Sequence, residues 1–143
     1  MSEDDLRRDC NNQLTKQSDM NISLSDNVAK ITAFNQIDLN NSDRIFWFGY
    51  CYEHGIDVEK DEHKAFDYYQ QSANMNNSEG MYQVGHCYYL GIGVKMDKYK
   101  AFEYYQKSAN EGNSNGIYKT AICYYFKIGV KEDYKKYKYW IEK

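Results

Sequence analysis

Three cysteines recur at a constant spacing, and thiols can bind metals, form disulfides or act as nucleophiles. Cys51, Cys87 and Cys123 are each separated by 36 residues. Equivalent residues on stacked helix pairs lie about 8–10 Å apart, whereas a disulfide needs Cα atoms within about 7 Å. We therefore expect all three to be buried, inert thiols that pack as small apolar groups. Cys10 lies in a polar segment and has no evident partner.

Other residues that could carry chemistry are few. The three histidines contain no pair at the i, i+4 spacing of a helix, and a zinc site needs about four ligands; they are His54, His63 and His86. The Ser-Asp-Asn sequence at 25–27 matches part of a penicillin-binding signature. The Ser-x-x-Lys that accompanies it is absent, and the single Lys-Thr is followed by Ala121. We predict no enzyme activity, no metal and no cofactor.

The cysteines belong to a longer pattern that the chain repeats. A shift of 36 residues carries much of 42–77 onto 78–113, and part of 78–113 onto 114–143. A fixed period of this length indicates stacked repeats, each of which buries its neighbour's apolar face. We expect the following recurring positions to fix the repeat structure: Gly49, Gly55, Ala65, Gly85, Gly91, Gly93, Asp97, Ala101, Ala109 and Gly129.

Each repeat is predicted to be a pair of helices. The first helix is expected to begin after a serine N-cap and to end near Leu90, where Gly91 provides a left-handed C-cap; the serines are Ser42, Ser78 and Ser114. Asp97 is expected to cap the second helix. Apolar and small residues in that helix recur at i, i+3, i+4, i+7 and i+8, which predicts a buried stripe. Gly85 and Ala101 leave room for the two backbones to approach closely.

Charge is unevenly distributed along the chain, whose net charge is −3. Residues 1–41 hold seven acids against four bases, while 42–143 hold fourteen of each. A neutral repeat region argues against nucleic-acid binding, which requires a basic surface. No apolar run reaches the roughly 20 residues that span a bilayer, and the first residues lack the apolar core of a secretion signal. We expect a cytoplasmic protein that does not bind a membrane.

The predicted fold class is an all-α solenoid of antiparallel helix pairs. Residues 1–24 are polar and aperiodic, so we expect them to be disordered. Residues 25–41 have a weak helical pattern and are interpreted as a possible degenerate N-capping helix. Residues 42–143 form the solenoid, with about two and two-thirds repeats at 42–77, 78–113 and 114–143.

The repeated motif resembles the Sel-1-like repeat, a relative of the tetratricopeptide repeat with a 36-residue unit. The residues that carry the resemblance are Gly85, Tyr88, Gly91, Gly93, Val94, Asp97, Lys100, Ala101, Tyr104, Tyr105, Ser108, Ala109 and Gly112. Asp57 and Lys127 replace loop glycines of this motif. Gly80 and Gly116 stand where the family usually has alanine, which is expected to loosen each helix by about 0.5–1 kcal/mol.

The resemblance implies a non-catalytic adaptor or scaffold that binds a protein or peptide. We expect the first helices to line the concave side, with two rows of candidate binding residues on it: Tyr50, His86 and Ile122, and Glu53, Tyr89 and Tyr125. An alternative is a structural repeat fragment of a larger signalling protein with no binding site of its own. RNA binding is a third hypothesis, which the balanced charge opposes. The partner and the oligomeric state stay open.

Overall fold

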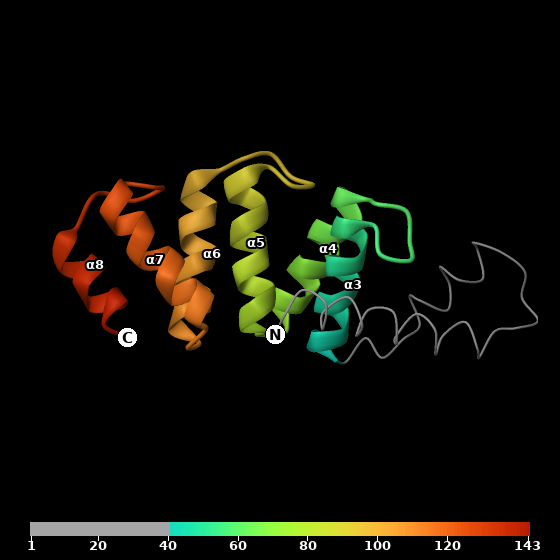
Figure 1. The fold of residues 1–143 in the computed structure, drawn as a ribbon, viewed down its shortest axis with the longest axis horizontal. Coiled ribbons are helices and arrows are strands. Elements are labelled where there is room, and N and C mark those ends of the chain that lie inside the picture. Colours follow the sequence, from blue (N-terminus) through green and yellow to red (C-terminus); the bar gives the residue numbers. More distant parts are fainter. Residues whose placement is uncertain (1–40) are drawn as a thin grey trace, which may run out of the picture.

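The computed structural model describes residues 41–143 as a single row of helices (Figure 1). The helices are α3 (Ser42–His54), α4 (Glu62–Asn74), α5 (Ser78–Leu90), α6 (Lys98–Asn110), α7 (Ser114–Phe126) and α8 (Tyr134–Ile141). No strand occurs within this range. The predicted all-α solenoid is therefore confirmed. The expected disordered segment 1–24, and the expected capping helix 25–41 apart from its last residue, lie outside the described residues.

The helices form three pairs, and the two helices of a pair differ in their position in the stack. Every helix packs on the next one along the chain. In addition, α3 contacts α5 and α5 contacts α7, whereas no such contact joins α4 to α6 or α6 to α8 among the described residues. The first helices of the pairs are thus closer together than the second helices. We conclude that α3, α5 and α7 line the inner, shorter side of the solenoid.

The N-caps of the first helices differ from the expectation. Asn41, Asn77 and Asn113 are the caps, and Ser42, Ser78 and Ser114 are instead the first helical residues. The asparagine oxygen accepts hydrogen bonds from backbone amides, as in the 2.9 Å bond from Gly80 N to Asn77 Oδ1. The Asn77 amide also donates to Ser42 Oγ (3.0 Å), so the cap joins two repeats. In the second helices, Asp61, Asp97 and Asp133 are N-caps, as the sequence predicts.

Glycines within the helices allow neighbouring helices to approach closely. A Cβ atom at Gly85 would lie 2.8 Å from the Tyr105 ring, and one at Gly49 would lie 2.7 Å from the Tyr69 ring. The interpretation of Gly80 and Gly116 as weak points was incomplete. A Cβ atom at Gly116 would lie 2.7 Å from the backbone nitrogen of Ala109, so these glycines allow the second helix of one repeat to contact the first helix of the next.

The loop within each pair uses left-handed backbone at two positions. Gly91 and Gly93 have φ angles of +75° and +68°. A Cβ atom at Gly93 would overlap the carbonyl oxygen of Glu62, which belongs to the preceding repeat. Asp57, at the equivalent position of the first repeat, keeps the left-handed conformation (φ 59°) and is exposed. Lys127 likewise adopts the left-handed C-cap (φ 59°), so its strain does not change the loop shape.

Aromatic contacts continue from one repeat to the next. Phe66 of α4 meets Tyr88 of α5 with ring centroids 5.5 Å apart, and Phe102 of α6 meets Tyr124 of α7 at 5.2 Å. Tyr69 and Tyr105 are 0% and 1% exposed and fill the space over the helical glycines. Aromatic contacts consequently join each repeat to the next along the row of α3, α5 and α7.

Candidate functional site

The six candidate residues lie on α3, α5 and α7 but differ widely in exposure. Tyr50 is buried (9% exposed) and packs against His54, with ring centroids 4.2 Å apart. Tyr125, in the last repeat, is 49% exposed. The other four, Glu53, His86, Tyr89 and Ile122, are partly buried. The inner surface is therefore more accessible at its C-terminal end than at its N-terminal end.

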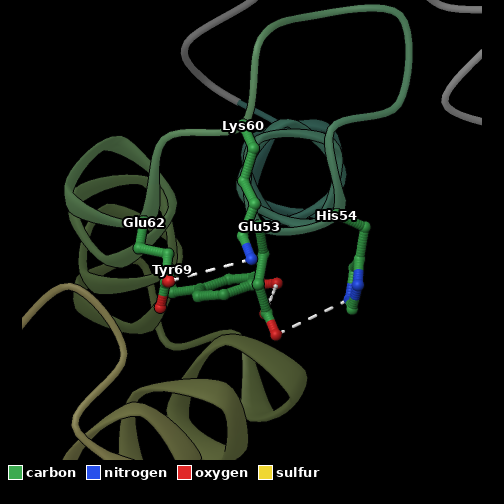
Figure 2. A network of polar contacts seen from close by, with 5 residues as sticks. All are labelled: Glu53, His54, Lys60, Glu62 and Tyr69. Carbon is green, nitrogen blue, oxygen red and sulfur yellow. Dashed lines mark hydrogen bonds and ion pairs between the residues drawn. The ribbon is translucent and has the colours of Figure 1, made fainter.

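The carboxylate of Glu53 is held by its own repeat. Figure 2 shows the Tyr69 side chain reaching from α4 to Glu53, where its hydroxyl donates a 2.7 Å hydrogen bond to Oε1. His54 Nε2 lies 3.6 Å from the other carboxylate oxygen. Burial, followed by the nearby carboxylate, raises the pKa of Tyr69, so its proton stays in place. The Glu53–Tyr69 contact links α3 to α4, and sequence analysis did not identify it.

The second repeat has the same tyrosine without that acceptor. Tyr89 occupies the position equivalent to Glu53, and the buried Tyr105 hydroxyl has no hydrogen-bond partner among the described residues. The Tyr105 ring packs against Tyr82 at 5.7 Å, and Tyr82 stacks on His86 at 6.2 Å. This part of the inner row is therefore aromatic where the first repeat is polar.

His86 lies between charged groups from two neighbouring helices. Burial lowers the pKa of its imidazole below 6.5; Glu53 of α3 opposes this effect, and Lys119 of α7 and His54 of α3 add to it. His86 Nδ1 is buried without a hydrogen-bond partner in the described part of the chain. At neutral pH the imidazole is consequently uncharged, and Lys119 of α7 provides the positive charge near it.

The lowered pKa of His86 makes the folding stability depend on pH. Below about pH 6.5 the unfolded chain binds a proton at this position that the folded chain resists, so the free energy of unfolding should fall as the pH decreases. Replacing His86 by glutamine should remove this contribution. Urea denaturation at about pH 7.5 and pH 5.5 measures the effect. A decrease equal in both proteins would show that titratable groups other than His86 cause it.

The cysteines partly follow the expectation. Cys87 and Cys123 are free and buried. Burial raises the pKa of the Cys123 thiol to about 11 and raises that of Cys87 as well, so neither forms a reactive thiolate at neutral pH. Cys51, in contrast, is disulfide-bonded. The expectation of three inert thiols is therefore wrong for Cys51.

Two absences can be stated for residues 41–143. They contain no group of three or more histidine, cysteine, aspartate or glutamate residues arranged to hold a metal ion. None of the helices between Ser42 and Ile141 is both long enough and apolar enough to span a bilayer.

Sequence patterns did not reveal a group of four aromatic residues at the C-terminal end, of which Tyr125, Phe126 and Tyr134 are exposed and Tyr137 is partly buried. Tyr125 and Phe126, at the end of α7, have ring centroids 4.9 Å apart, and Tyr125 meets Tyr137 of α8 at 5.0 Å. Tyr134 lies 5.6 Å from Tyr137. A comparison of the second and third repeats could have revealed this group. Phe126, Tyr134 and Tyr137 are aromatic in the third repeat, whereas the equivalent residues of the second repeat are Leu90, Lys98 and Ala101.

Comparison with known proteins agrees with this architecture. The sequence model of the Sel1 repeat matches residues 46–77, 78–113 and 114–143. No curated protein matches the chain. A solved Sel1 repeat protein from Oxalobacter formigenes is 28% identical with a TM-score of 0.73, and the match covers 80% of this chain and 47% of that one.

Two further solved structures share the fold. A protective antigen of uropathogenic Escherichia coli strains, described as displaying an SLR fold, is 25% identical with a TM-score of 0.75; the match covers 95% of this chain and 29% of the other. Cysteine rich protein B of Helicobacter pylori is 21% identical with a TM-score of 0.55 over 77% of this chain and 93% of the other, which indicates the fold alone. The chain thus spans less than half the length of the first two structures.

Proposed function

The chain belongs to the Sel1 repeat family, and we propose that it is a non-catalytic adaptor or scaffold that binds a peptide or protein along the concave face of α3, α5 and α7. The supporting observation is the gradient of exposure on this face. Ile122 and Tyr89 are partly buried and Tyr125 is 49% exposed. Accessible aromatic side chains are common anchors at protein interfaces.

The concave residues are assigned different roles in this proposal. Tyr89, Ile122 and Tyr125 contact the partner, since they belong to the more accessible end of the face. Glu53 and His86 shape the surface from partly buried positions, and Tyr50 supports it from the core. The competing hypothesis, a repeat fragment of a larger signalling protein with no binding site, predicts no effect of the exposed residues on partner capture.

Binding along the concave face is tested with a combined Ile122→Ser and Tyr125→Ser variant. A partner is first identified by cross-linking and then purified, and its affinity is measured by calorimetry. Loss of these two anchors should weaken binding by at least about tenfold. Tyr99→Ser is the control, because Tyr99 is 78% exposed on α6, outside the concave face. Equal affinities for all three proteins would support the fragment hypothesis, and circular dichroism checks that each variant is folded.

We also propose the absence of nucleic-acid and membrane binding, and the cytoplasmic location that the sequence suggests. The balanced charge of residues 42–143 supports the first two statements. One observation opposes the location: Cys51 is disulfide-bonded, and disulfides are rare in the cytosol of mesophilic organisms. Thiol labelling of the protein in cell extracts prepared with a quenching alkylating agent decides between a reducing and an oxidising compartment.

A further inference from the structure

The C-terminal end of the solenoid exposes a compact aromatic surface. We call Tyr125, Phe126, Tyr134 and Tyr137 the C-terminal aromatic patch. Phe126 and Tyr134 are each 61% exposed, and successive rings in the patch are 4.9–5.6 Å apart. Contiguous exposed aromatic residues are unusual on a protein surface and typically mark an interaction site. The first two repeats do not carry such a group at the equivalent positions.

The surroundings of the patch are basic. Residues 127–143 contain six lysines and three acidic residues, a net charge of +3 by difference, in a chain whose net charge is −3. Lys127 is paired with Glu132 at 3.4 Å, and Lys136 lies over the Tyr124 ring at 5.5 Å. Lys135 and Lys138 are exposed on α8, and no carboxylate among the described residues forms an ion pair with either. Their charges are available to a partner.

The outer surface of α8 departs from the pattern that stacks one repeat on the next. Phe66 and Phe102 reach the following repeat, whereas Lys138 occupies the equivalent position on α8. Within the stack, Gly93 and Gly129 each lie against a backbone carbonyl of the preceding repeat. If a second copy stacked head to tail on α8, its Asp57 would occupy the position equivalent to these glycines. A side chain does not fit in that contact. A head-to-tail copy stacked in the register of the repeats is therefore disfavoured at this end.

We propose that the C-terminal aromatic patch, together with Lys135 and Lys138, docks an acidic segment of a partner protein. An aromatic or aliphatic side chain of that segment packs on the exposed rings, and its carboxylates pair with the two lysines. The surface is distinct from the concave face, with which it shares only Tyr125. The proposal consequently does not depend on binding along α3, α5 and α7, and its test leaves Tyr125 unchanged.

The test uses synthetic 15-residue peptides in which glutamates flank a single phenylalanine, tryptophan or leucine, with matched series that carry glutamine or lysine instead. The full chain should bind the glutamate series and not the other two, and binding should weaken with added salt. Two variants, Phe126→Ser with Tyr134→Ser and Lys135→Glu with Lys138→Glu, should each weaken binding by about tenfold or more. A Lys95→Glu and Tyr99→Ser variant, which changes an exposed lysine and tyrosine of the second repeat, should bind like the unchanged chain.

Four results would overturn the proposal. The first is a failure of the glutamate series to bind more tightly than the glutamine series. The second is binding of phosphatidylserine vesicles that the same variants lose while the peptides do not bind, which assigns the patch to a membrane. The third is binding of single-stranded RNA that the same variants lose while the peptides do not bind, which assigns the patch to nucleic acid. The fourth is a dimer in solution that Phe126→Ser with Tyr134→Ser dissociates, which assigns it to a second copy.

Discussion

Replacing Gly93 by alanine is expected to lower the free energy of unfolding by about 3–5 kcal/mol. The φ angle of Gly93 is +68°, a conformation that costs a residue with a Cβ atom about 1–2 kcal/mol. The new Cβ atom would also overlap the carbonyl oxygen of Glu62. Because that oxygen belongs to the backbone of α4, the overlap can be removed only if the first and second repeats move apart. Chemical denaturation followed by circular dichroism measures the loss.

The matched control for Gly93 is Asp57, which has the same backbone conformation in the first repeat. Its φ angle is 59° and its side chain is exposed. Asp57→Ala therefore tests the left-handed backbone without the contact between repeats, and should cost no more than about 1 kcal/mol. Gly129→Ala should resemble Gly93→Ala, since Gly129 meets the Lys98 carbonyl in the same way. Similar losses for Gly93→Ala and Asp57→Ala would refute the contact as the reason for glycine.

The helix pairs could be predicted because their signals are local and recur. Asp61, Asp97 and Asp133 each precede a helix and cap it. Gly91 ends α5 in the left-handed conformation that few other residues adopt without strain. Each such signal depends on residues close in sequence, and its repetition after 36 residues makes a chance match improbable.

Contacts between repeats were harder to predict, since they depend on how the pairs are stacked. Asn77 and Ser78 are both good N-cap residues, and sequence alone does not decide between them. The structure selects asparagine because its amide also reaches Ser42 of the preceding repeat. The loop motif identified Gly93 only as a turn residue. Its second role, contact with the Glu62 carbonyl, becomes visible when α4 and the next loop are placed side by side.

The helices that carry the six candidate residues could be predicted, whereas the burial of each residue could not. Periodicity placed the six residues on the inner helices, yet it does not determine how deeply each side chain is buried. Glu53 illustrates the limit: no acidic residue recurs at Tyr89 or Tyr125, so no repeated pattern revealed its bond to Tyr69. The 49% exposure of Tyr125 likewise could not be read from the repeated pattern.

The two equivalent tyrosines lead to opposite expectations for the same substitution. Tyr69→Phe should destabilise the chain by about 1.5–3 kcal/mol, because it removes a hydrogen bond to a carboxylate and leaves Glu53 without that partner. Tyr69 is fully buried, and the Glu53 side chain is 12% exposed. Tyr105→Phe removes a buried hydroxyl that has no partner in the described range. It should change the free energy of unfolding by less than about 0.5 kcal/mol, or increase it.

The Tyr69→Phe prediction can be checked by changing Tyr89, which stands in the second repeat where Glu53 stands in the first. Tyr89→Glu places a carboxylate where Glu53 stands in the first repeat, within reach of the Tyr105 hydroxyl if the two repeats share the same geometry. In that background Tyr105→Phe should become destabilising, and the difference between the two backgrounds gives the coupling energy of the new bond. Equal effects of Tyr69→Phe and Tyr105→Phe in the unchanged chain would contradict the assignment. The 2.7 Å contact in the first repeat would then add nothing to stability.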